Sequence, residues 1–236
     1  MGLVAAAPAQ AQETVAADWA CIPKDSSNNA LVTAGQSFRL LFVTSTTTQA
    51  TSTSISTYND IVKTLAATNS CFTTAQANQF RAFISTSATS AKSNTATTGT
   101  GERIYWMKGA KVADNYADFF DNSWDSNAAK NESGSSQAGL AWTGTWAGGN
   151  SRSGRTAGSD NVNWMNPSSS GNLGVANSPK TNSNRLLALS PVFTVQDPPA
   201  KPTNLSATAG NAQVSLSWPM FNVSWRESAD FGVFLT

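Results

Sequence analysis

The chain has 236 residues, of which 40% are hydrophobic and 12% are charged, with two cysteines and no histidine. The absence of histidine excludes Ser-His-Asp and Cys-His nucleophilic centres and imidazole-ligated metal sites, and two cysteines are too few for a thiolate cage. A formal net charge of +1 gives no electrostatic field that would attract a nucleic acid, so we expect no such partner. The 8 Trp and 11 Phe residues supply enough apolar material for a folded core.

The first residues are typical of the end of a secretory signal, because a short apolar stretch ends in the small-x-small pattern Ala9-Gln10-Ala11. We therefore expect residues 1–11 to be a signal-peptide remnant and the protein to be secreted or at the cell surface; an Ala-rich terminus without this role is the alternative. No later apolar run is long enough to cross a membrane, so no membrane span is expected. In an oxidising compartment Cys21 and Cys71 would form a disulfide, and two buried free thiols are the alternative.

The first half of the chain predicts a strand followed by two helices. Apart from Arg39, Phe38–Val43 is a compact run of aliphatic and aromatic residues, which is typical of a buried strand. Residues 54–67 place apolar side chains at helical spacing and predict an amphipathic helix that rests on this strand. A second helix is expected to begin near Thr73 or Thr74 and to lead into a short strand at 82–85.

The second half predicts short strands between irregular segments. Residues 86–102 lack periodicity and predict a surface loop, and Ile104–Met107 predicts a strand that enters a turn. Residues 140–146 form a Trp-rich strand candidate. The Gly-, Ser- and Asn-rich residues 148–184 predict a long irregular loop, which in a compact domain is typical of a binding segment or of local disorder. Residues 185–195 predict a closing strand or strand pair.

The Pro-rich residues 196–202 predict a stiff linker between two modules. The segment that follows alternates with a period of two, with a turn expected at Gly210-Asn211. It resembles the start of a fibronectin type III module, on the residues Pro202, Leu205, Ala207, Val214, Leu216 and Trp218. This resemblance implies a truncated module over 203–236, a partial β-sandwich that docks on the main domain or is poorly ordered, and neighbouring fibronectin type III modules in a longer parent protein.

The body of the chain, residues 19–195, resembles secreted bacterial modules of the C-type-lectin-like, endostatin-related kind. The resemblance lies in the order of four short blocks, Phe42-Val-Thr-Ser45, Phe80-Arg-Ala-Phe-Ile-Ser85, Trp142-Thr-Gly144 and Leu187-Ala-Leu-Ser190. It implies an α+β, C-type-lectin-like fold with long irregular loops, which is a scaffold suited to binding. The Glu-Pro-Asn and Trp-Asn-Asp motifs with which lectins of this kind hold calcium and sugar are absent, so no sugar-binding residue is carried over.

An acidic, aromatic stretch over 114–132 is the best candidate for chemistry. Calcium prefers several oxygen ligands, and Asp118, Asp121, Asp125 and Glu132 are the candidate ligands, although the EF-hand pattern is not met. A solvated acidic loop whose aromatic residues pack into the core is the alternative. Two of the carboxylates would also suit a glycosidase pair, which makes a secreted carbohydrate-active hydrolase or its accessory domain the second hypothesis for function.

Two tryptophans, Trp146 and Trp164, flank the irregular region and are candidates for stacking on a sugar ring or anchoring a protein. Trp142 is expected in the core. Arg152 and Arg155 are candidates for contacts with an anionic ligand; burial of the rings and a solvated loop are the alternatives.

The function we expect is therefore an extracellular binding or adhesion module without catalytic activity. Its binding face would be built by the loops 86–102 and 147–184, and its partner would be a glycan or an extracellular protein. No cofactor is expected apart from the calcium considered above. A structural spacer without a ligand is a third hypothesis.

Overall fold

A computed structural model of the chain describes residues 12–169, 171–197, 206–210 and 213–217. The chain divides into two compact units, Met1–Pro198 and Pro199–Thr236, and the division lies within the residues expected to form a linker. The expected signal-peptide remnant lies outside the described residues. Within the described part of the chain, no helix is both long and apolar enough to cross a bilayer.

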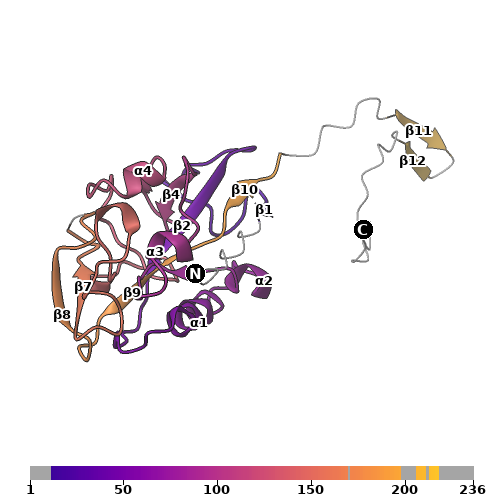
Figure 1. Ribbon diagram of the computed structural model, residues 1–236. Coiled ribbons are helices and arrows are strands. Elements are labelled where there is room, and N and C mark those ends of the chain that lie inside the picture. The colour runs from indigo at the N-terminus through magenta and orange to yellow at the C-terminus, as the bar shows by residue number, and fades with distance from the viewer. Residues whose placement is uncertain (1–11, 170, 198–205, 211–212, 218–236) are drawn as a thin grey trace. The chain divides into compact units, whose positions relative to one another are not determined.

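A mixed sheet of ten strands forms the framework of the first unit (Figure 1). The strands are β1 (Glu13–Val15), β2 (Ser37–Val43), β3 (Arg81–Ala82), β4 (Arg103–Trp106), β5 (Lys111–Ala113), β6 (Ala141–Trp142), β7 (Asn161–Met165), β8 (Ala176–Pro179), β9 (Arg185–Leu189) and β10 (Phe193–Val195). The main path runs β1-β10-β2-β9-β6-β7-β8, while β3 also pairs with β9, and β4 pairs with both β2 and β5. The pairs β1–β10, β2–β4 and β6–β9 are parallel, whereas β7 and β8 form an antiparallel hairpin.

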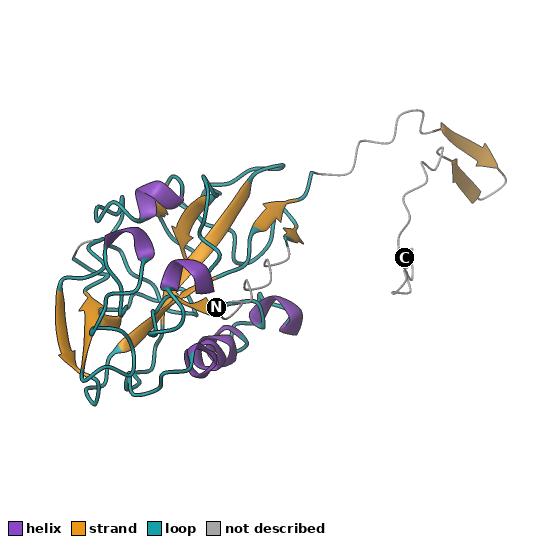
Figure 2. Cartoon of the chain, in the orientation of Figure 1, coloured by secondary structure: helices purple, strands orange, loops and turns teal. Residues whose placement is uncertain are grey.

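The helices of the described residues are short, and loops connect most of the elements (Figure 2). They are α1 (Ile55–Ala66), α2 (Thr74–Ala77), α3 (Ala91–Asn94), α4 (Tyr116–Phe119) and the 3₁₀ helix η1 (Ala147–Gly149). A capping box begins α2: the Thr73 hydroxyl accepts the Gln76 N–H, and the Gln76 side chain accepts the Thr73 N–H. The helix start near Thr73 that the sequence predicts is therefore fixed by two reciprocal hydrogen bonds.

Strand β2 lies in the middle of the unit and is buried on both faces. Phe38, Leu40 and Phe42 belong to one hydrophobic cluster, while Leu41 and Val43 belong to a second cluster on the opposite face. This division follows from the alternation of side chains along a strand. Apolar residues on both alternating faces, interrupted here by Arg39, are the expected pattern of a strand that is covered on both sides.

Helices cover both of these faces, as Figure 1 shows for α1 and α2 on one side of β2 and for α4 on the other. Tyr58 and Val62 of α1 join the cluster of Phe38, whereas Phe119 of α4 joins the cluster of Leu41. The amphipathic helix that the sequence predicts thus packs on the predicted strand.

The expectation of an α+β, C-type-lectin-like fold is wrong, because the first unit is mainly a ten-stranded mixed sheet with few short helices. The second predicted helix ends at Ala77, and Arg81, which was expected in that helix, instead begins β3 beside β9. The predicted irregular loop 148–184 contains the hairpin β7–β8, and the predicted surface loop 86–102 contains α3 and several buried residues. In each case tertiary pairing overrides a sequence that is poor in β-branched residues or periodicity.

The second unit is described over the antiparallel strands β11 (Ser206–Gly210) and β12 (Gln213–Ser217). Gly210 pairs with Gln213 at the end of the ladder, and Asn211 of the expected turn lies outside the described residues. The residues expected to complete the truncated module, from Trp218 onward, lie outside the described residues. The resemblance of this segment to a fibronectin type III module stays a prediction.

Cys21 and Cys71 form a disulfide that closes a loop with a sequence separation of 50. The bridge joins the segment after β1 to the turn between α1 and α2. Trp19 reinforces the same junction, because its indole N–H donates to the Cys71 carbonyl at 2.7 Å and its ring packs on Phe72 and Phe193.

Ionisation of the buried Tyr58 side chain is expected to lower the free energy of unfolding of the first unit at alkaline pH. Its buried phenol donates to the Ser52 carbonyl at 2.8 Å, and burial raises its pKa to about 12. A phenol whose pKa is about 10 in the unfolded chain and higher in the folded protein contributes stability below pH 10 that is lost as the pH rises toward 12. We expect the free energy of unfolding of the wild type to fall by about 2 kcal/mol more than that of Tyr58→Phe between pH 10 and 12, as measured by urea titration at each pH. Parallel pH profiles for the two proteins would contradict this role of Tyr58.

Candidate functional site

Trp146 is the most exposed aromatic side chain of the described residues, with 48% of its surface accessible. It follows β6 in a tight loop in which its N–H donates to the Asn150 carbonyl and its carbonyl accepts the Gly149 N–H. Gly149 has a φ of 75°, and a Cβ at this position would lie 2.5 Å from the Phe120 ring. The loop therefore needs glycine here, and its close contact with the core holds the indole in place at the surface.

Arg152 covers the Trp146 ring, with its guanidinium carbon 3.7 Å from the ring centroid. At this distance the cation and the π-system attract each other, and the stacking restricts the rotamers of both side chains. The contact between Trp146 and Arg152 brings together two of the residues singled out from the sequence.

A tight turn over residues 152–155 places the second arginine beside the first. The Arg155 N–H donates to the Arg152 carbonyl at 2.9 Å, and Gly154, the third residue of the turn, has a φ of 67°. A positive φ at this position is typical of a type II turn. The turn is tied to the sheet at both ends, because the Arg152 N–H donates to Gly144 and the Arg155 carbonyl accepts the Asn163 N–H.

Two asparagines of the β7–β8 hairpin hold the two guanidinium groups. Nη1 of Arg152 donates to Oδ1 of Asn163 at 3.3 Å, and Nη1 of Arg155 donates to Oδ1 of Asn177 at 3.2 Å. Asn163 and Asn177 lie directly opposite each other across the antiparallel pair, so they lie on the same face of the hairpin. Asn163 is fully buried, and its Nδ2 donates to the Thr145 carbonyl at 2.9 Å, which fixes the orientation of its amide.

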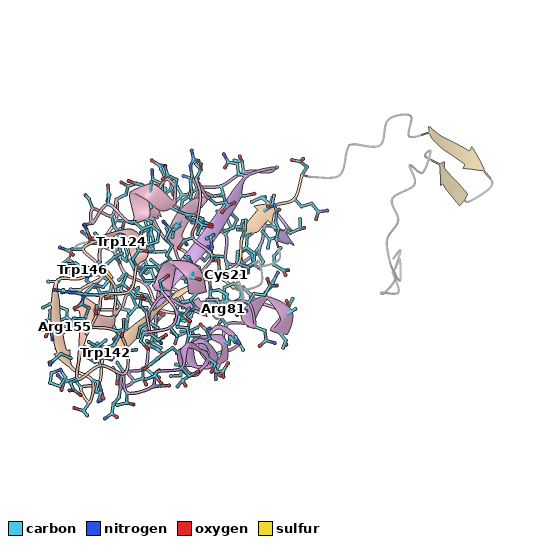
Figure 3. All side chains as sticks on the ribbon, viewed as in Figure 1. Cys21, Arg81, Trp124, Trp142, Trp146 and Arg155 are labelled. Atoms are coloured by element: carbon cyan, nitrogen blue, oxygen red, sulfur yellow. A yellow bond between two sulfur atoms is a disulfide. The ribbon has the colours of Figure 1, made fainter. Side chains whose placement is uncertain are left out.

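The surrounding surface carries positive charge and a second apolar side chain. Among the described residues, neither guanidinium forms an ion pair. Val175 is 48% exposed and follows Gly174, where a Cβ would lie 3.9 Å from the Trp146 Cα atom. Figure 3 shows Trp146 and Arg155 close to β7 and β8, on the side of the unit away from Cys21 and Arg81. We call the exposed part of this surface the arginine–tryptophan patch: Trp146, Arg152, Arg155, Val175 and Asn177.

Trp164, in contrast, does not belong to this patch. It is half-buried and pairs across β6 and β7 with the fully buried Trp142, in the hydrophobic cluster that also contains Phe38. Neighbouring residues of a strand point to opposite faces, so Trp164 points away from the face on which Asn163 meets Arg152. Trp146 and Trp164 therefore do not lie on one face of the unit, and Trp142 lies in the core as expected.

The expected calcium ligands do not form one site. Asp118 and Asp125 approach Asp114 at the end of β5, but Asp121 accepts a hydrogen bond from the Ser123 N–H, and this exposed residue is not part of the group. Glu132 is buried, and its Oε2 accepts the Ser45 N–H at 2.9 Å, so it braces the chain after β2.

A lysine already pairs with two carboxylates of the acidic group. Lys111 Nζ lies 2.6 Å from Asp114 and 3.0 Å from Asp125. The hydrogen bond from Lys111 holds the pKa of Asp114 below its usual value, and the same contact raises the pKa of Lys111. These three residues form a surface ion-pair network, and a calcium ion would have to displace the ammonium group.

A shallow groove of about 310 Å³ lies beside this network and is one of the concave features that ionisable groups line. Its lining residues are Val32, Gln36, Ser37, Gly101, Glu102, Arg103 and Asp114. Behind it, the Tyr116 hydroxyl donates to Glu102 at 2.6 Å and accepts a hydrogen bond from the buried Arg39 at 3.1 Å. Burial lowers the pKa of Arg39 and raises that of Tyr116. The chain of hydrogen bonds from Arg39 through Tyr116 to Glu102 explains how the fold accommodates the buried guanidinium of Arg39.

Sequence reasoning found Trp146, Arg152 and Arg155 but missed Asn163, Asn177 and Val175. The alternation of Asn161-Val-Asn-Trp-Met165 indicates a strand. The pairing of Asn163 with Asn177, however, depends on the register of a hairpin that the sequence does not predict. A scan against protein-family models finds no match to this chain, and a search of curated proteins finds none either.

Proposed function

We propose that the first unit is a binding module of a secreted or cell-surface protein, and that it holds an extracellular glycan at the arginine–tryptophan patch. The observation that carries the proposal is the exposed Trp146 ring, which is fixed at the surface by its loop and by the Arg152 stack. A large apolar ring that stays exposed while the other five tryptophans of the first unit are buried or half-buried suits a ligand contact. The Cys21–Cys71 disulfide suits an oxidising compartment outside the cytosol.

The polar groups around Trp146 support a glycan as the ligand. Ser153 and Asn177 are exposed: Ser153 follows Arg152 in the turn, and Asn177 accepts a hydrogen bond from Arg155. Hydroxyl and amide groups of this kind exchange hydrogen bonds with sugar hydroxyls. A protein partner of high affinity would instead require a larger apolar centre. Among the described residues, Trp146 and Val175 are the exposed large apolar side chains.

The contacts of the acidic stretch give no support to the alternative of a hydrolase. A general acid needs a raised pKa at neutral pH, but Lys111 lowers the pKa of Asp114. Asp125 belongs to the same ion-pair network, Asp118 accepts the Asp114 N–H, and Glu132 accepts the Ser45 N–H. We therefore propose binding without a catalytic step.

Affinity electrophoresis of the wild type in gels that contain one soluble polysaccharide each tests this proposal, with dextran, xylan, alginate and polygalacturonate as the panel. We expect at least one polysaccharide to retard the wild type and Trp146→Ala to weaken that binding about tenfold or more, because a stacked tryptophan carries a large share of such a contact.

Trp164→Phe is the matched control, since Trp164 lies on the opposite face and phenylalanine keeps its packing. We expect this variant to migrate as the wild type does. Equal retardation of wild type and Trp146→Ala in every gel would overturn the proposal, and so would an absence of retardation in all four.

A further inference from the structure

The two arginines of the patch are close enough to act on one ligand. They are the first and last residues of a single turn, and the ends of such a turn have Cα atoms less than about 7 Å apart. Their guanidinium groups are held by Asn163 and Asn177, whose Cβ atoms lie about 5 Å apart as directly opposed residues. This spacing is of the order of one sugar residue.

Both guanidinium groups keep most of their donors. An arginine has five N–H donors, and each of these two uses one of them in a hydrogen bond among the described residues. Arg152 is also fixed by the Trp146 ring, so little rotamer freedom is left to lose when it binds. A guanidinium that is held in place and has free donors is matched to a carboxylate, with which it forms two parallel hydrogen bonds.

No carboxylate of the hairpin competes for these donors. Asp160, at the start of β7, pairs instead with Lys180 at the end of β8, with Nζ and Oδ1 3.2 Å apart. The Asn side chains that hold the two arginines are neutral, so they orient the positive charge without cancelling it. The patch thus presents two positive charges next to an exposed ring.

The two arginine charges and the exposed Trp146 ring together favour one class of ligand for the arginine–tryptophan patch over others. A protein with a net charge of +1 lacks the broad basic surface that a nucleic acid needs, and the patch lacks the apolar centre of a peptide site. An acidic polysaccharide carries both of the features that the patch matches, namely sugar rings and carboxylates at regular spacing.

We infer that the ligand of the patch is a uronate-containing polysaccharide, whose carboxylates bind Arg152 and Arg155 while a sugar ring packs against Trp146. This inference rests on the proposed function and adds the chemical class of the glycan. Arg152 and Arg155 determine the preference for a charged chain, and Trp146 contributes to the binding of charged and neutral chains alike.

Polygalacturonate and its fully methyl-esterified form differ in their carboxylate charges and provide the test. We expect the wild type to bind polygalacturonate about a hundredfold more tightly than the ester in affinity electrophoresis, because each charge-assisted contact contributes about tenfold. The double variant Arg152→Gln, Arg155→Gln is expected to bind the two polymers equally. Arg155→Gln alone leaves the Trp146 stack intact and is expected to lose about tenfold of the preference.

The control removes the same two charges elsewhere. Lys24→Gln, Lys63→Gln changes the loop after Cys21 and helix α1, and we expect it to keep the full preference of the wild type. Equal binding of both polymers by the wild type would overturn the inference, and the proposed function would still stand if Trp146→Ala weakened both. Equal binding of polyglutamate and polygalacturonate would also overturn it, because charge alone would then decide. An absence of binding to either polymer overturns the inference, and retention of another polysaccharide that depends on Trp146 would leave the proposed function in place.

Discussion

The double variant Cys21→Ala, Cys71→Ala is expected to have a free energy of unfolding about 4 kcal/mol lower than that of the oxidised wild type. The bridge closes a loop with a sequence separation of 50, and in the chain-entropy model a cross-link of this length restricts the unfolded chain strongly. Urea unfolding followed by tryptophan fluorescence measures the difference.

Reduction provides the control for this variant. The wild type in excess dithiothreitol should unfold at the urea concentration found for the double variant, and the reductant should leave the variant unchanged. A wild type whose unfolding midpoint is the same with and without reductant would show that the bridge does not stabilise the fold. The indole hydrogen bond from Trp19 to Cys71 would then be sufficient to hold the junction.

Replacement of Arg39 by alanine is expected to lower the free energy of unfolding by about 3–5 kcal/mol. The side chain is 1% exposed, and its guanidinium donates to the carbonyls of Ser190 and Thr95 and to the Tyr116 hydroxyl. Alanine leaves these buried acceptors without a donor and also leaves a cavity beside β2.

Arg39→Met separates these two contributions, because methionine fills much of the same volume without any donor. We expect the methionine variant to lie between alanine and wild type, with a loss of about 2 kcal/mol from the unsatisfied carbonyls. Urea titrations of the three proteins at pH 7 give the comparison. If alanine and methionine cost less than 1 kcal/mol each, the buried hydrogen bonds of Arg39 would not be needed for stability.

Some elements are encoded locally and could be predicted from the sequence. The apolar run Phe38–Val43 forms β2, residues 55–66 of the predicted helix form α1, and Thr73 begins α2 by a capping box with the next glutamine. In each of these cases a short-range signal of periodicity or capping coincides with burial.

Other elements depend on pairing between distant segments. Strand β8 has the sequence Ala-Asn-Ser-Pro, which is poor in strand-forming residues, and it exists because β7 supplies its hydrogen-bond partners. Strand β3 has two residues and is held by β9. The sequence predicts a loop at β8 and places only Ala82 of β3 in a strand, so the fold class that it predicts contains too little strand.

The residues of the candidate site also divide into those that the sequence predicts and those whose roles depend on the pairing of distant segments. Trp146, Arg152 and Arg155 were visible as residue types with suitable chemistry, close together in the chain. The exclusion of Trp164 and the roles of Asn163 and Asn177 follow from which face of β7 each residue occupies, and this is set by register. The acidic residues form an ion-pair network because Lys111, on β5, comes within reach of Asp114 and Asp125.

A titration of the ¹⁵N-labelled protein with a short oligogalacturonate, followed by NMR, tests the central claim most directly. We predict that the indole N–H of Trp146, the Nε–H groups of Arg152 and Arg155 and the backbone amides of 152–155 shift together and saturate at one ligand concentration. The indole N–H of Trp164, on the other face of β7, should not move with them. Shifts confined to the groove of Glu102 and Asp114, or an unchanged spectrum at the patch while the oligosaccharide binds, would contradict the claim.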